Sequence, residues 1–186
     1  LARAVEQKLF SEGRFVFFMG IANVLYGVDA DIKKPGTDQP HRPEHLPAML
    51  DALEDADVVI GSRWVPGGGV VNWPRHRQWL SQGGNRYTQV MLGLGVRDAT
   101  AGYRAYRRSA LERMDLATVA SQGYCFQVDL TRRAAAAGLK IAEVPITFVE
   151  REQGDSKMSG SIVAEALWRV TQWGVAGHAQ RLQGKR

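Results

Sequence analysis

The chain has 186 residues, of which 45% are hydrophobic and 23% charged, a composition typical of one globular domain that excludes a disordered chain. Its single cysteine excludes an internal disulfide, favours a reducing compartment and, with four histidines, leaves too few ligands for a thiolate-rich zinc site. The formal charge of +5 favours an anionic partner, such as a phosphate, a nucleotide, a nucleic acid or lipid headgroups.

The pattern of apolar residues predicts alternating helices and strands. The expected elements, in chain order, are a helix over 1–13, a strand over 24–28, a loop over 32–42, a helix around 46–53, a strand over 56–61, a loop over 66–69, a helix over 74–91, a strand over 103–107, a helix over 126–137, a strand over 139–149 and a helix over 162–182. The run over 56–61 is continuously apolar, which predicts a buried and parallel strand. The alternation predicts an α/β fold with a sheet flanked by helices, in a single domain over 1–186.

The longest uncharged run, residues 15–28, is shorter than the roughly 20 apolar residues that span a bilayer. It is interrupted by Gly20, Asn23 and Gly27, and no small-residue cleavage site follows it. We therefore expect a buried strand or helix in this run, and neither a membrane span nor a signal peptide.

Two carboxylates, Asp29 and Asp31, directly follow the expected strand over 24–28. Carboxylates two residues apart at a strand end can both reach one hard divalent cation, whose remaining positions water and phosphate oxygens can fill. Ligands of α/β folds also bind at the carboxyl ends of the strands. The pair is a candidate metal site, and a solvated turn is the alternative interpretation.

Basic and hydroxyl side chains gather after the next expected strand and at the start of the helix that follows. Arg63 ends the segment Gly61-Ser62-Arg63, and Arg75 and Arg77 open the helix. Ser81 lies one turn after Arg77, so these two side chains share a helix face. Guanidinium groups and a hydroxyl around a helix start are suited to a phosphate, although ordinary surface arginines would look the same.

Two further segments carry candidate chemistry. Asp98 opens a tight bend of small residues, where it could act as a base, accept a hydrogen bond from a hydroxyl, or merely belong to a turn. Arg151 and Lys157 flank a glycine in an expected flexible loop, an arrangement that could close over a diphosphate or remain a solvated charged loop. Cys125 is expected to be an inert, buried thiol.

Taken together, these segments resemble the polyprenol (dolichol) phosphate mannose synthases, which are family 2 glycosyltransferases of the GT-A fold, and they look especially like the actinobacterial enzymes. The resemblance runs from about Asp29 to the C-terminus. It is closest in five motifs, which occur in the family's order: Ile60-Gly61-Ser62-Arg63, Asn72-Trp73-Pro74, the segment 98–107 (DATAGYRAYR), the segment 123–127 (GYCFQ) and the segment 144–161 (VPITFVEREQGDSKMSGS).

The resemblance implies GDP-mannose as the donor. In such enzymes the paired carboxylates hold Mg²⁺ or Mn²⁺ on the donor diphosphate, a role that falls on Asp29 and Asp31 in this sequence. A loop arginine and lysine bind the donor phosphates, which implies Arg151 and Lys157. The resemblance therefore makes Asp31, Arg151 and Lys157 candidate catalytic residues that stabilise the departing GDP.

The resemblance also implies a polyprenyl monophosphate as the acceptor, with inversion at the sugar carbon. The residues that hold the acceptor phosphate would be Arg63, Arg77 and Ser81. A phosphate monoester has its second pKa near 6, so its oxygen is already anionic at pH 7 and no general base is required. We therefore expect Asp98, the fourth candidate catalytic residue, to orient other groups before it acts as a base.

The sequence departs from the family in its first half. The family begins with a strand carrying a P-x-Y-N-E-type turn and then an acidic strand end, and neither occurs in residues 1–28. The segment after Asp31 reads Ile32-Lys33-Lys34-Pro35, where the family usually continues as D-A-D-G-S. These departures predict an incomplete GT-A domain that a missing segment or a membrane-anchoring subunit would complement.

The last helix, over 161–186, is expected to be amphipathic. Its apolar stripe comprises Ile162, Val163, Ala166, Leu167, Val170, Trp173 and Gly174. Such a stripe usually packs in a protein core, but with a lipid acceptor the helix could lie on a bilayer with Trp168 or Trp173 at the headgroups. We expect peripheral attachment at the cytoplasmic face of a membrane.

Three alternatives remain open at this stage. A polyprenyl-phosphate glycosyltransferase with a UDP-linked donor would keep the fold and change the sugar. A non-catalytic module could bind polyprenyl phosphate or an anionic membrane. Nucleic-acid binding fits the charge of +5, but we expect none because the basic residues are dispersed and no recognised motif accompanies them.

Overall fold

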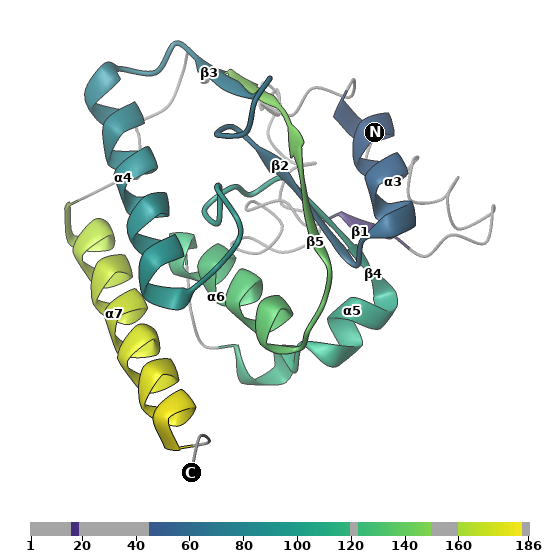
Figure 1. The fold of residues 1–186 in the computed structure, drawn as a ribbon. Coiled ribbons are helices and arrows are strands. Elements are labelled where there is room, and N and C mark those ends of the chain that lie inside the picture. Colours follow the sequence, from purple (N-terminus) through teal and green to yellow (C-terminus); the bar gives the residue numbers. More distant parts are fainter. Residues whose placement is uncertain (1–15, 19–44, 120–122, 150–159, 184–186) are drawn as a thin grey trace, which may run out of the picture.

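A computed structural model describes residues 16–18, 45–119, 123–149 and 160–183 (Figure 1). The elements predicted over 1–13, 24–28 and 32–42 lie outside the described residues. The helices are α3 (Leu46–Asp55), α4 (Arg75–Leu92), α5 (Arg108–Arg113), α6 (Gly123–Ala136) and α7 (Gly160–Gln183), with a short 3₁₀ turn at Leu116–Thr118. The four helices predicted over these ranges are confirmed, and α5 and the 3₁₀ turn, which are too short to show a helical period, are additional.

The main sheet has four strands in the order β1 (Val16–Phe18), β4 (Arg104–Arg107), β2 (Val58–Ser62) and β5 (Ile141–Pro145). β2 pairs parallel with β5 and antiparallel with β4. The expected parallel pairing of β2 is therefore confirmed on one side only. β4 runs back because the chain enters it beside the end of β2, where Arg104 lies opposite Ile60.

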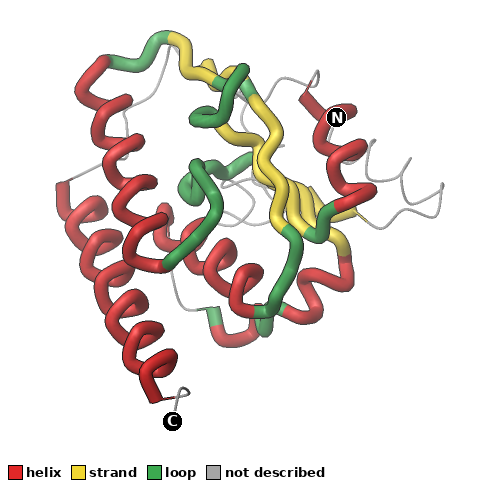
Figure 2. The backbone as a smooth tube through the Cα atoms, viewed as in Figure 1, coloured by secondary structure: helices red, strands yellow, loops and turns green. Residues whose placement is uncertain are grey.

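Helices cover both faces of this sheet, as Figures 1 and 2 show. Side chains of a strand alternate between its faces, and β2 follows this rule. Val59 joins the core cluster that contains Met49 of α3, whereas Val58 and Ile60 join the cluster that contains Leu130 of α6. Burial on both faces explains why β2 is apolar throughout, and it confirms the predicted α/β architecture with a mixed sheet flanked by helices.

A second, two-stranded sheet corrects two predictions. β3 (Gly69–Val71) begins at the last residue of the loop expected over 66–69, and β6 (Thr147–Val149) occupies the end of the single strand expected over 139–149; the two pair in parallel. The chain turns at Ile146, whose N–H donates to the Ser62 carbonyl while its own carbonyl accepts from Gly69 N–H. The expected strand therefore divides into β5 and β6, each with a different partner.

The apolar stripe of α7 packs into the protein, against α4 and α6. Val170 is 2% exposed, Trp173 is partly buried, and the Thr171 hydroxyl lies 2.7 Å from that of Tyr87 on α4. Trp168, which lies beside the stripe, is 64% exposed. Most of the described stripe therefore belongs to the core, whereas Leu167, at 40% exposure, and Trp168 reach the surface. None of the helices in the described part of the chain is long and apolar enough to cross a membrane.

The crossing of α4 and α7 depends on a glycine. A methyl group at Gly174 would lie 2.8 Å from the Met91 carbonyl oxygen, so Gly174→Ala should force the helices apart. We expect a loss of about 1–3 kcal/mol in the free energy of unfolding, measured by thermal denaturation. Gly177→Ala is the matched control, since a methyl group there meets nothing within 4 Å and alanine favours the helix. Equal melting temperatures for the two variants would contradict this account of the crossing.

Candidate functional site

A buried ion pair lies where β2 ends. Arg63 follows the last residue of β2, and Asp98 lies in the loop from α4 to β4; they are 7% and 0% exposed. Asp98 Oδ2 accepts hydrogen bonds from the backbone N–H of Arg63 at 2.9 Å and from its Nε at 2.8 Å, and Oδ1 accepts from Nη2 at 2.7 Å. Both carboxylate oxygens are therefore engaged by one arginine, in the forked geometry that is strongest for this pair.

This pairing determines which guanidinium nitrogen of Arg63 can donate a hydrogen bond to a ligand. Its Nη2 also donates to Thr100 Oγ1 at 3.0 Å. Nη1 has no hydrogen-bond partner among the described residues, so it is the guanidinium nitrogen left to contact an anion. Asp98 is placed to orient Arg63, and its full burial keeps it from solvent.

A tryptophan connects Arg63 to α4. Trp73 is 9% exposed, and its ring lies 5.3 Å from the guanidinium carbon of Arg63 and 4.3 Å from that of Arg77. Both distances fall in the range of cation–π contacts. Phe148 of β6 packs edge-on against Trp73, with 5.6 Å between the ring centroids. The structure thus brings Arg63 and Arg77 to one aromatic ring, although they are far apart along the chain.

The predicted serine completes this group. Ser81 and Arg63 both line a cavity of about 90 Å³ bounded by α4, α6 and α7. Its polar lining side chains are Arg63, Ser81, Thr88 and Thr100, and its apolar ones include Leu80, Val128, Val163, Leu167 and Val170. Leu80 and Leu167 are also partly exposed, at 46% and 40%. The cavity is therefore amphipathic, with an arginine and hydroxyl groups beside a larger apolar surface.

Cys125 also lines this cavity and is 4% exposed. Burial raises the pKa of its thiol above the ordinary value, and the negative charge of Glu165 adds to the effect. A thiol of raised pKa forms little of the reactive thiolate near neutral pH. Cys125 thus fits the inert, buried group that the sequence predicts.

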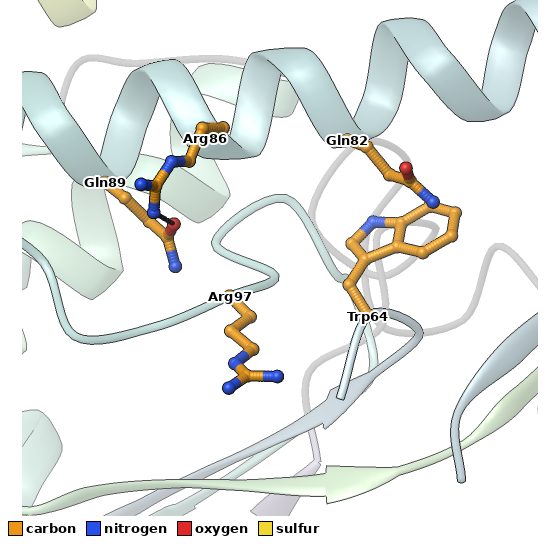
Figure 3. A pocket seen from close by; sticks show the side chains of 5 residues that line it. All are labelled: Trp64, Gln82, Arg86, Gln89 and Arg97. Atoms are coloured by element: carbon orange, nitrogen blue, oxygen red, sulfur yellow. Dashed lines mark hydrogen bonds between the residues drawn. The ribbon is translucent and has the colours of Figure 1, made fainter. Parts of the chain in front are cut away.

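A second cavity, of about 440 Å³, is lined by Trp64 and by four polar side chains (Figure 3). Gln82, Arg86 and Gln89 line it from α4, and Arg97 lines it from the loop that follows, with its side chain directed away from α4. Arg86 Nη1 donates to Gln89 Oε1 at 3.4 Å. Sequence patterns do not predict this basic cavity, because its residues belong to none of the motifs.

Sequence reasoning also missed Asn85, which is 2% exposed and hydrogen-bonds to both Asp98 and Thr100. The available signal was its spacing, since Asn85 lies one turn after Ser81 on α4. Four predicted site residues lie outside the described ones: Asp29, Asp31, Arg151 and Lys157. No group of three or more potential metal ligands occurs within the described ranges.

Known proteins resemble this chain over most of its length. Residues 37–115 match the family described as Glycosyl transferase family 2. The polyprenol monophosphomannose synthase of Mycolicibacterium smegmatis is 55% identical over 163 residues, which cover 87% of this chain and 59% of that protein. Over residues 37–115 this chain is therefore similar to glycosyltransferase family 2. The undecaprenyl-phosphate mannosyltransferase of Micrococcus luteus is also 55% identical over 163 residues, covering 88% of this chain and 64% of that protein.

The family 2 match includes the whole ion-pair site, since Arg63, Arg77, Ser81 and Asp98 all fall within 37–115. The chain spans less than two thirds of the length of either relative.

Proposed function

We propose that this chain provides the acceptor-binding part of an enzyme that transfers mannose from GDP-mannose to a polyprenyl monophosphate. One observation carries the proposal: Arg63 and Ser81 line an amphipathic cavity, and Arg77 shares the Trp73 ring with Arg63. A polyprenyl phosphate has the matching chemistry, with a doubly charged head and an apolar tail. The names of the two relatives, which refer to polyprenol or undecaprenyl phosphate and to mannose, support this choice of substrates.

The head group would be held by directed hydrogen bonds. Among the described residues none occupies Arg63 Nη1, which lies beside the Asp98 pair, and the Ser81 hydroxyl adds a donor from the helix that carries Arg77. Hydrogen bonds from guanidinium groups to phosphate are among the strongest in proteins. The apolar side chains of α4, α6 and α7 would contact the first part of the tail.

The reaction follows from the charge of the acceptor. An oxygen of the phosphate monoester, anionic at pH 7, would form the new bond to the anomeric carbon of mannose from the face opposite the GDP. The bond between that carbon and the GDP oxygen breaks, and its electron pair leaves with GDP. No proton is transferred, so positioning and neutralisation of charge supply the catalysis.

The donor side of the proposal rests on residues outside the described ranges. Arg151 and Lys157 would neutralise the donor phosphates, and Asp29 and Asp31 would hold Mg²⁺ or Mn²⁺, for which carboxylates are suitable hard ligands. A bound cation would supply additional positive charge at the diphosphate. Activity that survives treatment with EDTA would contradict the metal assignment.

The proposal includes peripheral contact with the cytoplasmic face of a membrane. Two large aromatic side chains are exposed on neighbouring helices, Trp79 of α4 at 71% and Trp168 of α7 at 64%. Tryptophan is suited to the headgroup region of a bilayer, where its ring is buried and its N–H stays hydrated. These helices also form the cavity, so the same surface could meet both the membrane and its lipid substrate.

Incubation with radiolabelled GDP-mannose, a polyprenyl phosphate and Mg²⁺ or Mn²⁺ tests the proposal directly. We expect label to enter the organic phase only when acceptor and metal are both present. UDP-glucose in place of GDP-mannose tests the choice of donor. Lipid binding without transfer, by a chain shown to be folded, would restrict the function to recognition of the acceptor.

A further inference from the structure

The phosphate-binding candidates come from two separate parts of the fold. Arg63 follows β2, whereas Arg77 and Ser81 belong to α4. A single phosphate can contact both groups only if α4 is fixed in both distance and rotation relative to the end of β2. Trp73 contacts both arginines, but a ring face allows sliding and does not define a position along α4.

Asn85 of α4 forms directional hydrogen bonds to the 98–100 loop. Its Nδ2 lies 3.0 Å from the Ser81 carbonyl, 3.3 Å from Asp98 Oδ1 and 3.0 Å from Thr100 Oγ1, and its Oδ1 accepts from the Thr100 backbone N–H at 3.2 Å. The donor and acceptor sides of one amide therefore both bond to the loop that holds Arg63. Since the side chain is 2% exposed, water cannot easily replace these bonds.

The loop to which Asn85 is hydrogen-bonded is also attached to the main sheet. Glu143 of β5 accepts hydrogen bonds from the backbone N–H groups of Arg97, at 2.8 Å, and Asp98, at 2.9 Å. From the other side, the buried Arg104 donates to the carbonyls of Ala99, at 2.6 Å, and Ala101, at 2.7 Å. The loop is therefore fixed to the sheet by its backbone, and a bond to it defines a position relative to β2.

We propose that Asn85 is a positioning residue for acceptor binding: it fixes α4 against the 98–100 loop, so that Arg77 and Ser81 lie at the distance from Arg63 that one phosphate requires. This inference rests on the proposed function. Asn85 acts through the other residues and does not contact the ligand. An amide is required because a carboxylate would repel Asp98 and lose the donors, and an apolar side chain would leave the Thr100 N–H unsatisfied.

Asn85→Leu, which keeps the branched shape of the side chain and removes both of its polar atoms, tests the inference. We expect the KM for polyprenyl phosphate to rise about tenfold, as for the loss of a hydrogen bond to a charged group, while kcat falls by much less and the KM for GDP-mannose is unchanged. Farnesyl phosphate, used as a soluble probe in calorimetry, should bind about tenfold more weakly. This second readout does not require transfer.

Gln89→Leu is the matched control. Gln89 also ties α4 to the following loop, through Nε2 to the Val96 carbonyl at 2.7 Å, but one turn beyond Asn85. Both variants should melt at a lower temperature than the unaltered chain, and only Asn85→Leu should weaken binding of the acceptor. An unchanged KM in folded Asn85→Leu, or an equal rise in Gln89→Leu, would overturn the inference.

A variant that fails to fold still leaves a test. Thr100→Val removes the hydroxyl to which Asn85 donates and keeps the Thr100 N–H, so we expect a smaller rise in the acceptor KM; no rise would overturn the inference. A wild-type chain that neither transfers mannose nor binds farnesyl phosphate would instead contradict the proposed function.

Discussion

Replacement of Asp98 by alanine should lower the free energy of unfolding by about 3–5 kcal/mol, the usual cost of leaving one partner of a buried ion pair uncompensated. Arg63 is 7% exposed, so solvent cannot replace the two carboxylate oxygens that it would lose. Its backbone N–H would also lose its acceptor. Urea denaturation followed by circular dichroism measures the change.

The double variant Asp98→Ala, Arg63→Met provides the control. Methionine removes the charge and keeps much of the volume, so the double variant should be more stable than Asp98→Ala alone by about 1–2 kcal/mol. If the loss in the free energy of unfolding of the double variant equals the sum of the losses of Asp98→Ala and Arg63→Met, Asp98 stabilises the fold by some route other than Arg63.

The second large effect is expected at Arg77. Arg77→Ala should reduce kcat/KM for polyprenyl phosphate by about 10²-fold, since hydrogen bonds to charged groups contribute roughly 1.5–3 kcal/mol each and the guanidinium also stacks on Trp73. Arg77→Lys should recover only part of this loss, because an ammonium lacks the planar fork. Initial rates at varied acceptor and saturating GDP-mannose measure the effect.

Arg86→Ala is the comparison for Arg77, because it removes an exposed guanidinium from the same helix on the side of the second cavity. We expect its kcat/KM for the acceptor to stay close to that of the unaltered chain. The KM for GDP-mannose should also be unchanged in Arg77→Ala. A parallel loss for donor and acceptor would indicate a folding defect and contradict the assignment of Arg77 to the acceptor.

Local patterns predicted the parts of the fold that local physics determines. The apolar run of β2 and the periodicity of α4 are properties of neighbouring residues, and both elements lie where they were expected. The spacing of Arg77 and Ser81 likewise places them on one helix face. The second sheet was missed because β3 and β6 are three residues long and stabilise each other across the chain.

In the site, too, local patterns predicted single residues but not the contacts between distant ones. Asp98 was recognisable as a candidate, but its partner lies 35 residues away, so its pattern could not distinguish a base from an ion-pair partner. Glu143 carries no local signature, and the helical spacing of Asn85 from Ser81 does not identify the partners of its amide. They become informative only when the loop, α4 and β5 are seen together.

The Arg63–Asp98 pair also affects how long a ligand would stay. Asp98 offsets the charge that Arg63 presents, so the site attracts an anion less strongly than its arginines alone would suggest. The proposed reaction converts a dianionic monoester into a phosphodiester with a single negative charge. In that reaction a site with moderate positive potential would hold the first more tightly than the second, so the internal ion pair would favour product release.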